Sequence, residues 1–139
     1  EDIVKLNNKM IQNNLDMGTL GCEFKSNSIL KNENIVKVIT QEKLNINNFS
    51  KALSFFRKSQ NKKILNIYHH IGVYAYKVSI LEKFINLKQT KNEIQERLEQ
   101  LRALENNISI MVLMAKSSPI GVDTKQDFLA IKKIMEYKS

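Results

Sequence analysis

The chain has 139 residues, with 22 lysines and arginines against 14 aspartates and glutamates, giving a net charge of +8. The basic residues are scattered among asparagines and isoleucines and form no stripe, so we expect no nucleic-acid partner. Its apolar runs are shorter than the roughly 18 residues of a membrane span, so we expect no insertion into a membrane. The single cysteine, Cys22, cannot form an internal disulfide, which fits a reducing cytoplasm.

One helix and three strands are predicted in the first half of the chain. Residues 1–14 carry apolar side chains at helical spacing: Ile3, Val4, Leu6, Met10 and Ile11. Because natural domains rarely begin inside such a helix, and no initiator methionine is present, we expect a piece of a longer protein. Strands rich in β-branched and apolar residues are predicted over 17–24, 34–40 and 49–58.

The second half alternates strands with helices. Residues 67–77, IYHHIGVYAYK, form a continuous apolar run, which predicts a strand buried on both faces. A short helix over 78–87 and a buried strand over 108–115 are also predicted. A final helix is expected over 125–139, with Thr124 as its N-cap and Asp127 completing a capping box. This order of elements predicts an α/β fold with a mixed sheet and flanking helices.

Residues 91–107, KNEIQERLEQLRALENN, are predicted to form one long helix. Its apolar face would comprise Ile94, Leu98, Leu101 and Leu104. Asn106 and Asn107 are suited to ending it in a left-handed conformation.

Polar side chains interrupt the apolar run at 67–77. Strand alternation places His70, Gly72, Tyr74 and Tyr76 on one face. A glycine between polar neighbours leaves space for a ligand or for another backbone. The same pattern also fits a core histidine beside tyrosines whose hydroxyls are hydrogen-bonded.

Two further segments carry candidate polar groups. Glu99 and Gln100 lie within the predicted long helix, where Glu99 could instead pair with Arg102 on the surface. Asp123 follows a predicted strand, where open α/β sheets bind ligands. A carboxylate there could hold Mg²⁺ or could simply cap the following helix.

Three motifs, HIGVYAYKVSILEKF, RLEQLRALEN and IGVDTKQDF, occur in an order and spacing that identify a family. They resemble the C-terminal half of bacterial 3-deoxy-manno-octulosonate (Kdo) cytidylyltransferases, the CMP-Kdo synthetases. That family's pattern reads approximately HIGIYAYR, ESLEQLRALE and GVDTPEDL. Weaker similarity through DMGTLGCEF, NIVKVIT and KALSFFRK extends the resemblance over essentially the whole chain.

The resemblance implies a Rossmann-like nucleotidyltransferase in which the 2-hydroxyl of Kdo attacks the α-phosphate of CTP. The products are CMP-Kdo, used in lipopolysaccharide biosynthesis, and pyrophosphate. The family implies Mg²⁺ as cofactor, a homodimer and a cytoplasmic location. Residues 1–139 would then be a C-terminal fragment carrying the sugar-binding and dimerisation side. The N-terminal CTP-binding half would be absent, and the fragment alone would be inactive.

The resemblance also implies the site residues. It assigns sugar contacts to His70, Tyr74, Glu99 and Gln100, a carboxylate or phosphate contact to Arg57, and the catalytic Mg²⁺ ligand to Asp123. The chain departs from the family pattern before Arg57, where Ser54 and Phe56 replace a tyrosine and a serine. Two alternatives stay open: a cytidylyltransferase for another acidic sugar such as a sialic acid, and a non-catalytic module for sugar-acid binding or dimerisation.

Overall fold

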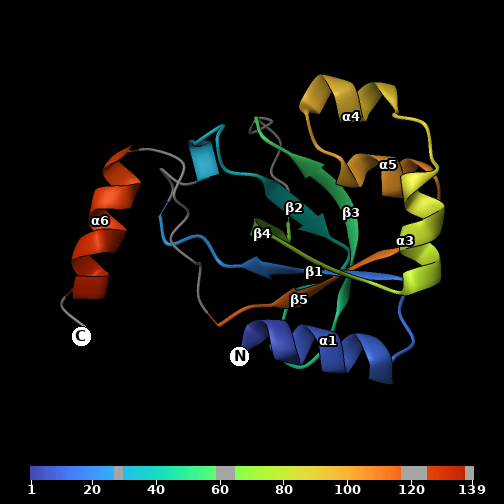
Figure 1. The fold of residues 1–139 in the computed structure, drawn as a ribbon, viewed down its shortest axis with the longest axis horizontal. Helices are drawn as coiled ribbons and strands as arrows, with labels where there is room; N and C mark the ends of the chain where they lie inside the picture. Colours follow the sequence, from blue (N-terminus) through green and yellow to red (C-terminus); the bar gives the residue numbers. More distant parts are fainter. Residues whose placement is uncertain (27–29, 59–64, 117–124, 137–139) are drawn as a thin grey trace.

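The computed structural model describes residues 1–26, 30–58, 65–116 and 125–136. Its elements in chain order are α1 (Asp2–Gln12), β1 (Met17–Cys22), β2 (Lys37–Thr40), β3 (Ser50–Phe56), β4 (Ile67–Tyr76), α3 (Val78–Ile85), α4 (Lys91–Glu96), α5 (Gln100–Glu105), β5 (Ile110–Met114) and α6 (Lys125–Glu136) (Figure 1). The predicted N-cap Thr124 and the side chain of its partner Asp127 lie outside the described residues.

The described strands form a mixed sheet whose pairings close into a ring. The order is β1-β4-β2-β3-β5, and β5 returns to pair with β1. The β1–β5 pair is parallel and the other pairs are antiparallel. The predicted mixed sheet with flanking helices is therefore confirmed. Its closure, which the sequence did not predict, gives each of these strands two neighbours.

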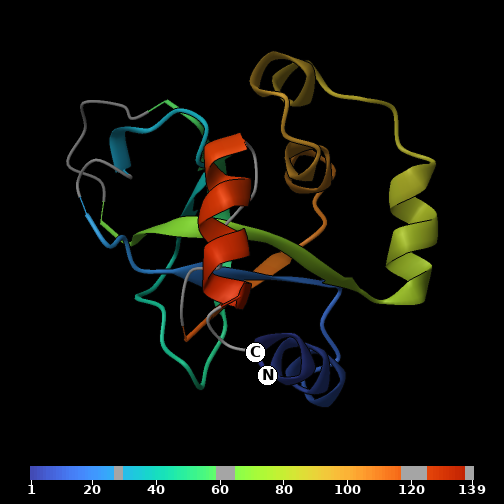
Figure 2. The ribbon, with the colours of Figure 1, turned by 60° about the vertical axis from the view of Figure 1, so that its left-hand side comes forward.

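Helices cover the sheet on two sides, with α1 on one side and α4 and α5 on the other (Figure 2). Leu6 and Met10 of α1 pack with Leu20, Cys22 and other apolar side chains on the outside of the sheet. The main core lies inside the ring. It includes Met17, Val38, Ala52, Phe55, Tyr68, Ile110 and Val112, drawn from all five strands.

Strand β4 differs from the expectation of burial on both faces. Its first half is mostly buried, but Gly72 is exposed and residues 73–76 are half-buried. The reason is that β2 pairs with β4 only through Ile67, Tyr68 and His69. Beyond these pairs, no described strand borders the second half of β4 on that side.

The predicted long helix over 91–107 is wrong, because two short helices, α4 and α5, occupy these residues. The break is at Arg97, whose left-handed backbone has φ 55° and ψ 49°. Leu98 and Leu101 are buried as expected, whereas Ile94 is 61% exposed and lies off the core. Asn107, with φ 58°, adopts the left-handed conformation predicted for the end of the segment.

Glu93 connects the two short helices. It forms a capping box with Thr90 at the start of α4, and its carboxylate accepts a hydrogen bond from the Thr90 amide at 3.1 Å. The same carboxylate pairs through both oxygens with the guanidinium of Arg102 in α5. Glu93 is only 2% exposed, and Arg102 holds the pKa of its carboxyl below the usual range. One buried carboxylate thus fixes α4 relative to α5.

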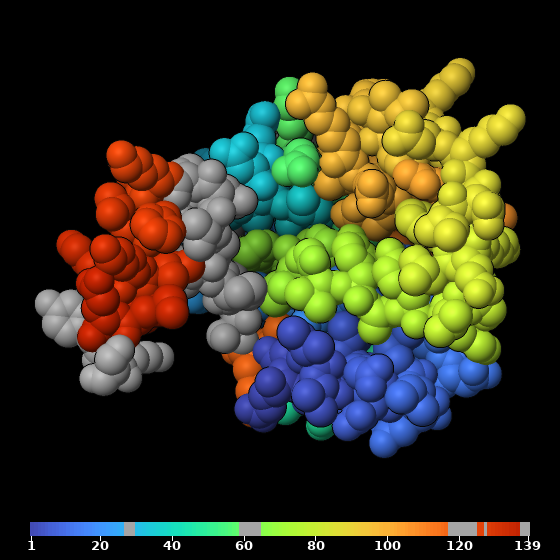
Figure 3. Space-filling model, in the orientation of Figure 1, coloured from blue at the N-terminus to red at the C-terminus, as the bar shows by residue number. Residues whose placement is uncertain are grey.

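Helix α6 stands at the side of the molecule away from α3 (Figure 3). Its exposed apolar side chains are Phe128, Leu129, Ile134 and Met135. Within the described part of the chain, no helix is long and apolar enough to cross a membrane.

We expect Glu93→Gln to lower the free energy of unfolding by about 3 kcal/mol, because it leaves a largely buried guanidinium without its counter-charge. Glu82→Gln, on the exposed surface of α3, is the control and should change stability by less than about 0.5 kcal/mol. Urea unfolding of both variants measures the difference. Equal stability of the two variants would show that the pair does not hold α4 against α5.

Candidate functional site

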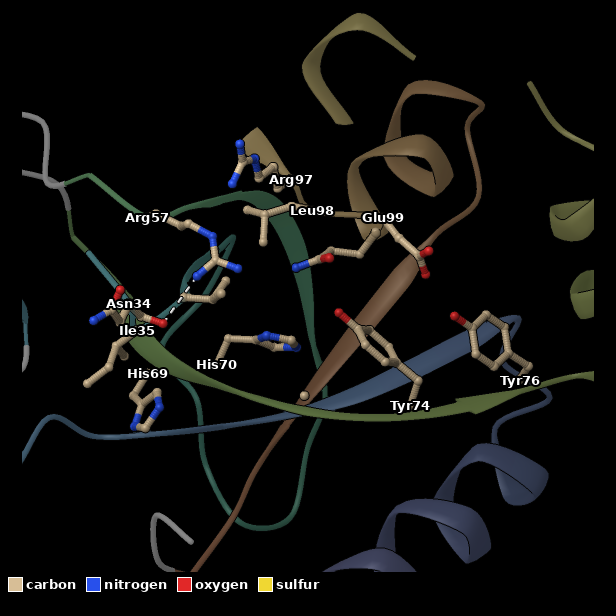
Figure 4. Close-up of a pocket in the computed structure, with 13 residues that line it drawn as sticks. Asn34, Ile35, Arg57, His69, His70, Tyr74, Tyr76, Arg97, Leu98 and Glu99 are labelled. Atoms are coloured by element: carbon tan, nitrogen blue, oxygen red, sulfur yellow. Dashed lines mark hydrogen bonds between the residues drawn. The ribbon is translucent and has the colours of Figure 1, made fainter. Parts of the chain in front are cut away.

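A hollow of about 510 Å³ lies beside the exposed half of β4. Five of the six predicted site residues line it: Arg57, His70, Tyr74, Glu99 and Gln100. They come from three separate parts of the chain: the end of β3, strand β4, and the start of α5 (Figure 4). The sixth, Asp123, lies outside the described residues. The structure thus brings these five residues together, while their roles stay predictions.

A bulge in β4 shapes the floor of this hollow. Thr19 of β1 lies opposite Tyr74, but the next residue, Leu20, lies opposite Ile71. Residues 72–73 of β4 are therefore extra in the pairing. Bulges bend a strand and are common beside binding sites, where they redirect side chains.

The insertion of two residues preserves the alternation of β4. His70, Gly72, Tyr74 and Tyr76 consequently all line the hollow, as predicted for one face of the strand. A Cβ atom added at Gly72 would meet no heavy atom within 4 Å. The space expected beside this glycine is therefore present.

His70 combines core packing with access to the hollow. Its Nε2 lies 3.0 Å from the Thr19 hydroxyl, and its ring lies edge-on to Phe55 with centroids 5.0 Å apart. The side chain is only 6% exposed. Burial, together with the neighbouring His69, lowers the pKa of His70 to about 4. The ring is therefore neutral at physiological pH.

Two polar groups at the hollow make no hydrogen bond to the described residues. The Tyr74 hydroxyl is enclosed and is the one such side-chain atom without a hydrogen bond in the described part of the chain. Burial raises the pKa of this hydroxyl, so it stays protonated and able to donate. Gln100 is 7% exposed, and its amide makes no hydrogen bond to the described residues. The alternative of a core tyrosine with a hydrogen-bonded hydroxyl is therefore wrong for Tyr74.

Glu99 is not used in a surface ion pair. The alternative that Arg102 pairs with it is wrong, because Arg102 binds Glu93 and places its guanidinium 4.9 Å from the centre of the Phe84 ring. Glu99 is left exposed at the mouth of the hollow, near the Tyr76 hydroxyl (Figure 4).

Two arginines, Arg57 and Arg97, line the hollow. Arg57 donates to the Asn34 carbonyl at 3.1 Å, and neither it nor Arg97 makes an ion pair with the described residues. Sequence reasoning missed Arg97, which replaces the serine of the ESLEQLRALE pattern. This replacement of serine by arginine was the one feature of the sequence that could have pointed to Arg97.

Sequence reasoning also missed Lys37, a buried lysine that binds the backbone of Arg57. The Nζ of Lys37 donates at 2.6 Å to the Arg57 carbonyl and at 2.6 Å to the Asn32 carbonyl. Lys37 is fully buried, and this burial lowers its pKa. The described residues contain no group of three or more histidine, cysteine, aspartate or glutamate side chains placed to bind a metal.

Comparison with known proteins identifies the family. A family model described as Cytidylyltransferase matches residues 1–110. The chain belongs to this family. It is 42% identical over 132 residues to 3-deoxy-manno-octulosonate cytidylyltransferase of Bartonella bacilliformis, covering 91% of this chain and 52% of the relative. The enzyme of that name from Mesorhizobium japonicum is 40% identical over 121 residues, covering 87% and 49%.

The resemblance inferred from the three motifs is thus confirmed, and this cytidylyltransferase chain spans about half the length of the curated relatives it matches. A solved structure of a CMP:2-keto-3-deoxy-manno-octonic acid synthetase complexed with CTP superposes with a TM-score of 0.83. The alignment covers 99% of this chain and 56% of that one, at 24% sequence identity. It confirms the predicted nucleotidyltransferase fold.

We expect Gly72→Leu to fill part of the hollow at little cost to the fold. Its backbone is not in the left-handed region and its side chain would enter open space, so stability should change by less than about 0.5 kcal/mol. Gly18→Leu is the matched control, because a Cβ there would lie 2.5 Å from the sulfur of Met10. It should cost roughly 1–3 kcal/mol. Thermal unfolding measures both stabilities. An equal loss of stability in the two variants would contradict an open space at Gly72.

Proposed function

We propose that this protein serves the transfer of CMP from CTP to the 2-hydroxyl of Kdo, giving CMP-Kdo and pyrophosphate. In this proposal the hollow beside β4 holds the sugar acid. One observation carries the proposal. A single hollow is lined by residues from separate Kdo-family motifs: Arg57, His70, Tyr74, Glu99 and Gln100.

The chemistry of the hollow suits an acidic sugar. A sugar carboxylate needs a fixed cation, and the forked guanidinium of Arg57 can bind both of its oxygens. Sugar hydroxyls need polar partners, which the unpartnered groups of Tyr74 and Gln100 supply. The rings of His70, Tyr74 and Tyr76 form a row that can contact the carbon skeleton. Neighbouring centroids lie 5.4 and 6.1 Å apart, with the ring planes tilted by 47° and 38°.

Binding in this hollow would position the sugar for reaction. The 2-hydroxyl oxygen bonds to the α-phosphorus of CTP, the bond from that phosphorus to pyrophosphate breaks, and the hydroxyl loses its proton. The described residues would act by holding the sugar in one orientation, which converts an encounter of two substrates into a positioned reaction. A site built for hydroxyls also rejects sugars that lack them, because its polar groups would be left unpaired.

The proposal places CTP binding in the half of the relatives that does not align with this chain. Mg²⁺ is the proposed cofactor, with Asp123 as its protein ligand. When bound, the ion would neutralise charge on the phosphates. We further propose a cytoplasmic homodimer whose product enters lipopolysaccharide biosynthesis. These last points rest on the family resemblance, and light scattering of the purified protein tests the dimer.

Pyrophosphate release is the decisive assay. The 139-residue chain alone should release none from CTP and Kdo. A chimera joining it to the non-aligning part of the Bartonella bacilliformis relative should be active with Kdo and much less active with a sialic acid. A preference for sialic acid would favour the alternative sugar, and an inactive chimera that binds both substrates would favour a non-catalytic module.

The same chimera tests Asp123. Asp123→Asn should lower turnover by orders of magnitude, because a neutral amide binds Mg²⁺ far less well than a carboxylate. Added Mg²⁺ should recover part of the loss, and Kdo affinity should change little. If Asp123 only capped a helix, its substitution would cost about 1 kcal/mol of stability and leave turnover intact.

We expect Tyr74→Phe to weaken Kdo binding without weakening the fold. The change removes a hydroxyl that has no partner among the described residues, so stability should be equal or higher. Affinity should fall roughly three- to tenfold, the value of one hydrogen bond. Tyr68→Phe is the matched control. Its hydroxyl accepts the Leu44 amide at 2.9 Å, so this variant should lose stability and keep affinity. Calorimetric titration and melting curves separate the two, and unchanged Kdo affinity in Tyr74→Phe would remove Tyr74 from the site.

A further inference from the structure

Thr19 of β1 contacts both the bulge and His70. It is fully buried and lies opposite the bulged part of β4. Its hydroxyl oxygen lies 2.8 Å from the Val73 carbonyl, 3.2 Å from the Ile71 carbonyl and 3.0 Å from Nε2 of His70. One hydroxyl therefore joins both ends of the bulge to the histidine.

Counting protons assigns the direction of these hydrogen bonds. A threonine hydroxyl has one proton, and backbone carbonyls can only accept. The proton of Thr19 is therefore directed to Val73, or shared between Val73 and Ile71. Its oxygen must accept from His70, which places the proton of the neutral imidazole on Nε2. The second ring nitrogen, Nδ1, is then an unprotonated acceptor.

Nδ1 of His70 is available to a ligand. It has no hydrogen-bond partner among the described residues. It is also not fully enclosed, since the Tyr74 hydroxyl is the one enclosed side-chain N or O atom without a partner in the described part of the chain. Because the His70 ring lines the hollow, we infer that a ligand held there can reach this acceptor.

We propose that Thr19 is a positioning residue that fixes the Nε2–H tautomer of His70, so that Nδ1 accepts a hydrogen bond from a hydroxyl of the sugar acid. Tyr74, whose ring centroid lies 5.4 Å from that of His70, lines the same hollow. The identity of the ligand rests on the proposed function, whereas the tautomer does not.

Nitrogen-15 NMR of the imidazole tests the tautomer directly. In the unliganded 139-residue protein, His70 should show a protonated Nε2 and a bare Nδ1. Thr19→Ser keeps the hydroxyl and should keep this pattern. Thr19→Val removes the hydroxyl at nearly equal volume and should give the other tautomer or a mixture. A wild-type ring protonated on Nδ1, or an unchanged pattern in Thr19→Val, would overturn the proposal. The wild-type spectrum decides even if Thr19→Val does not fold.

Kdo titration tests the consequence for binding. Thr19→Val should bind Kdo roughly three- to tenfold more weakly, Thr19→Ser should match the wild type, and the KM for CTP in the chimera should not change. If Thr19 had only a structural role, Thr19→Val would weaken the binding of both substrates, and that outcome would overturn the positioning role. If the wild type shows the expected tautomer and binds no Kdo, the tautomer stands and the proposed function fails.

Discussion

The buried ion pair between Glu93 and Arg102 is the interaction on which the candidate site depends most. A continuous helix over 91–107 would be a rod of about 25 Å, with its polar residues distributed around it. The pair instead folds α5 back against α4, at the left-handed residue Arg97. That turn places Glu99 and Gln100 at the same hollow as the rings on β4. Because Arg102 is satisfied by Glu93, Glu99 is available at the hollow.

Three deviations from regular structure lie at this hollow. The left-handed Arg97, the two-residue bulge of β4 and the unpartnered Tyr74 hydroxyl all lie at its wall. Each costs stability in isolation. Sites that bind ligands commonly break local rules which the rest of the fold obeys. Their coincidence at one place supports a binding role more strongly than any of them alone.

The sequence predicted the parts of the fold that follow from local pattern. Alternation placed His70, Gly72, Tyr74 and Tyr76 on one face, and family motifs added Arg57, Glu99 and Gln100. Apolar spacing could not reveal the break at Arg97, because Leu98 and Leu101 keep helical phase across it while a distant ion pair decides the geometry. Lys37 and Thr19 were missed for a related reason. The bonds from Lys37 to Arg57 and from Thr19 to His70 span 20 and 51 positions, so no short motif contains them.

The ring of strands is closed unevenly. The pairing of β3 with β5 involves only Ser50 with Val112 and Lys51 with Met111, whereas β1 pairs with β4 along its whole length, from Met17 to Cys22. In the order of the ring, this short pairing between β3 and β5 lies opposite β4. Transient opening of the ring would therefore begin where the fewest bonds must break. Separation there would leave the pairing of β1 with β4, which holds the strand of the histidine and the tyrosines, in place.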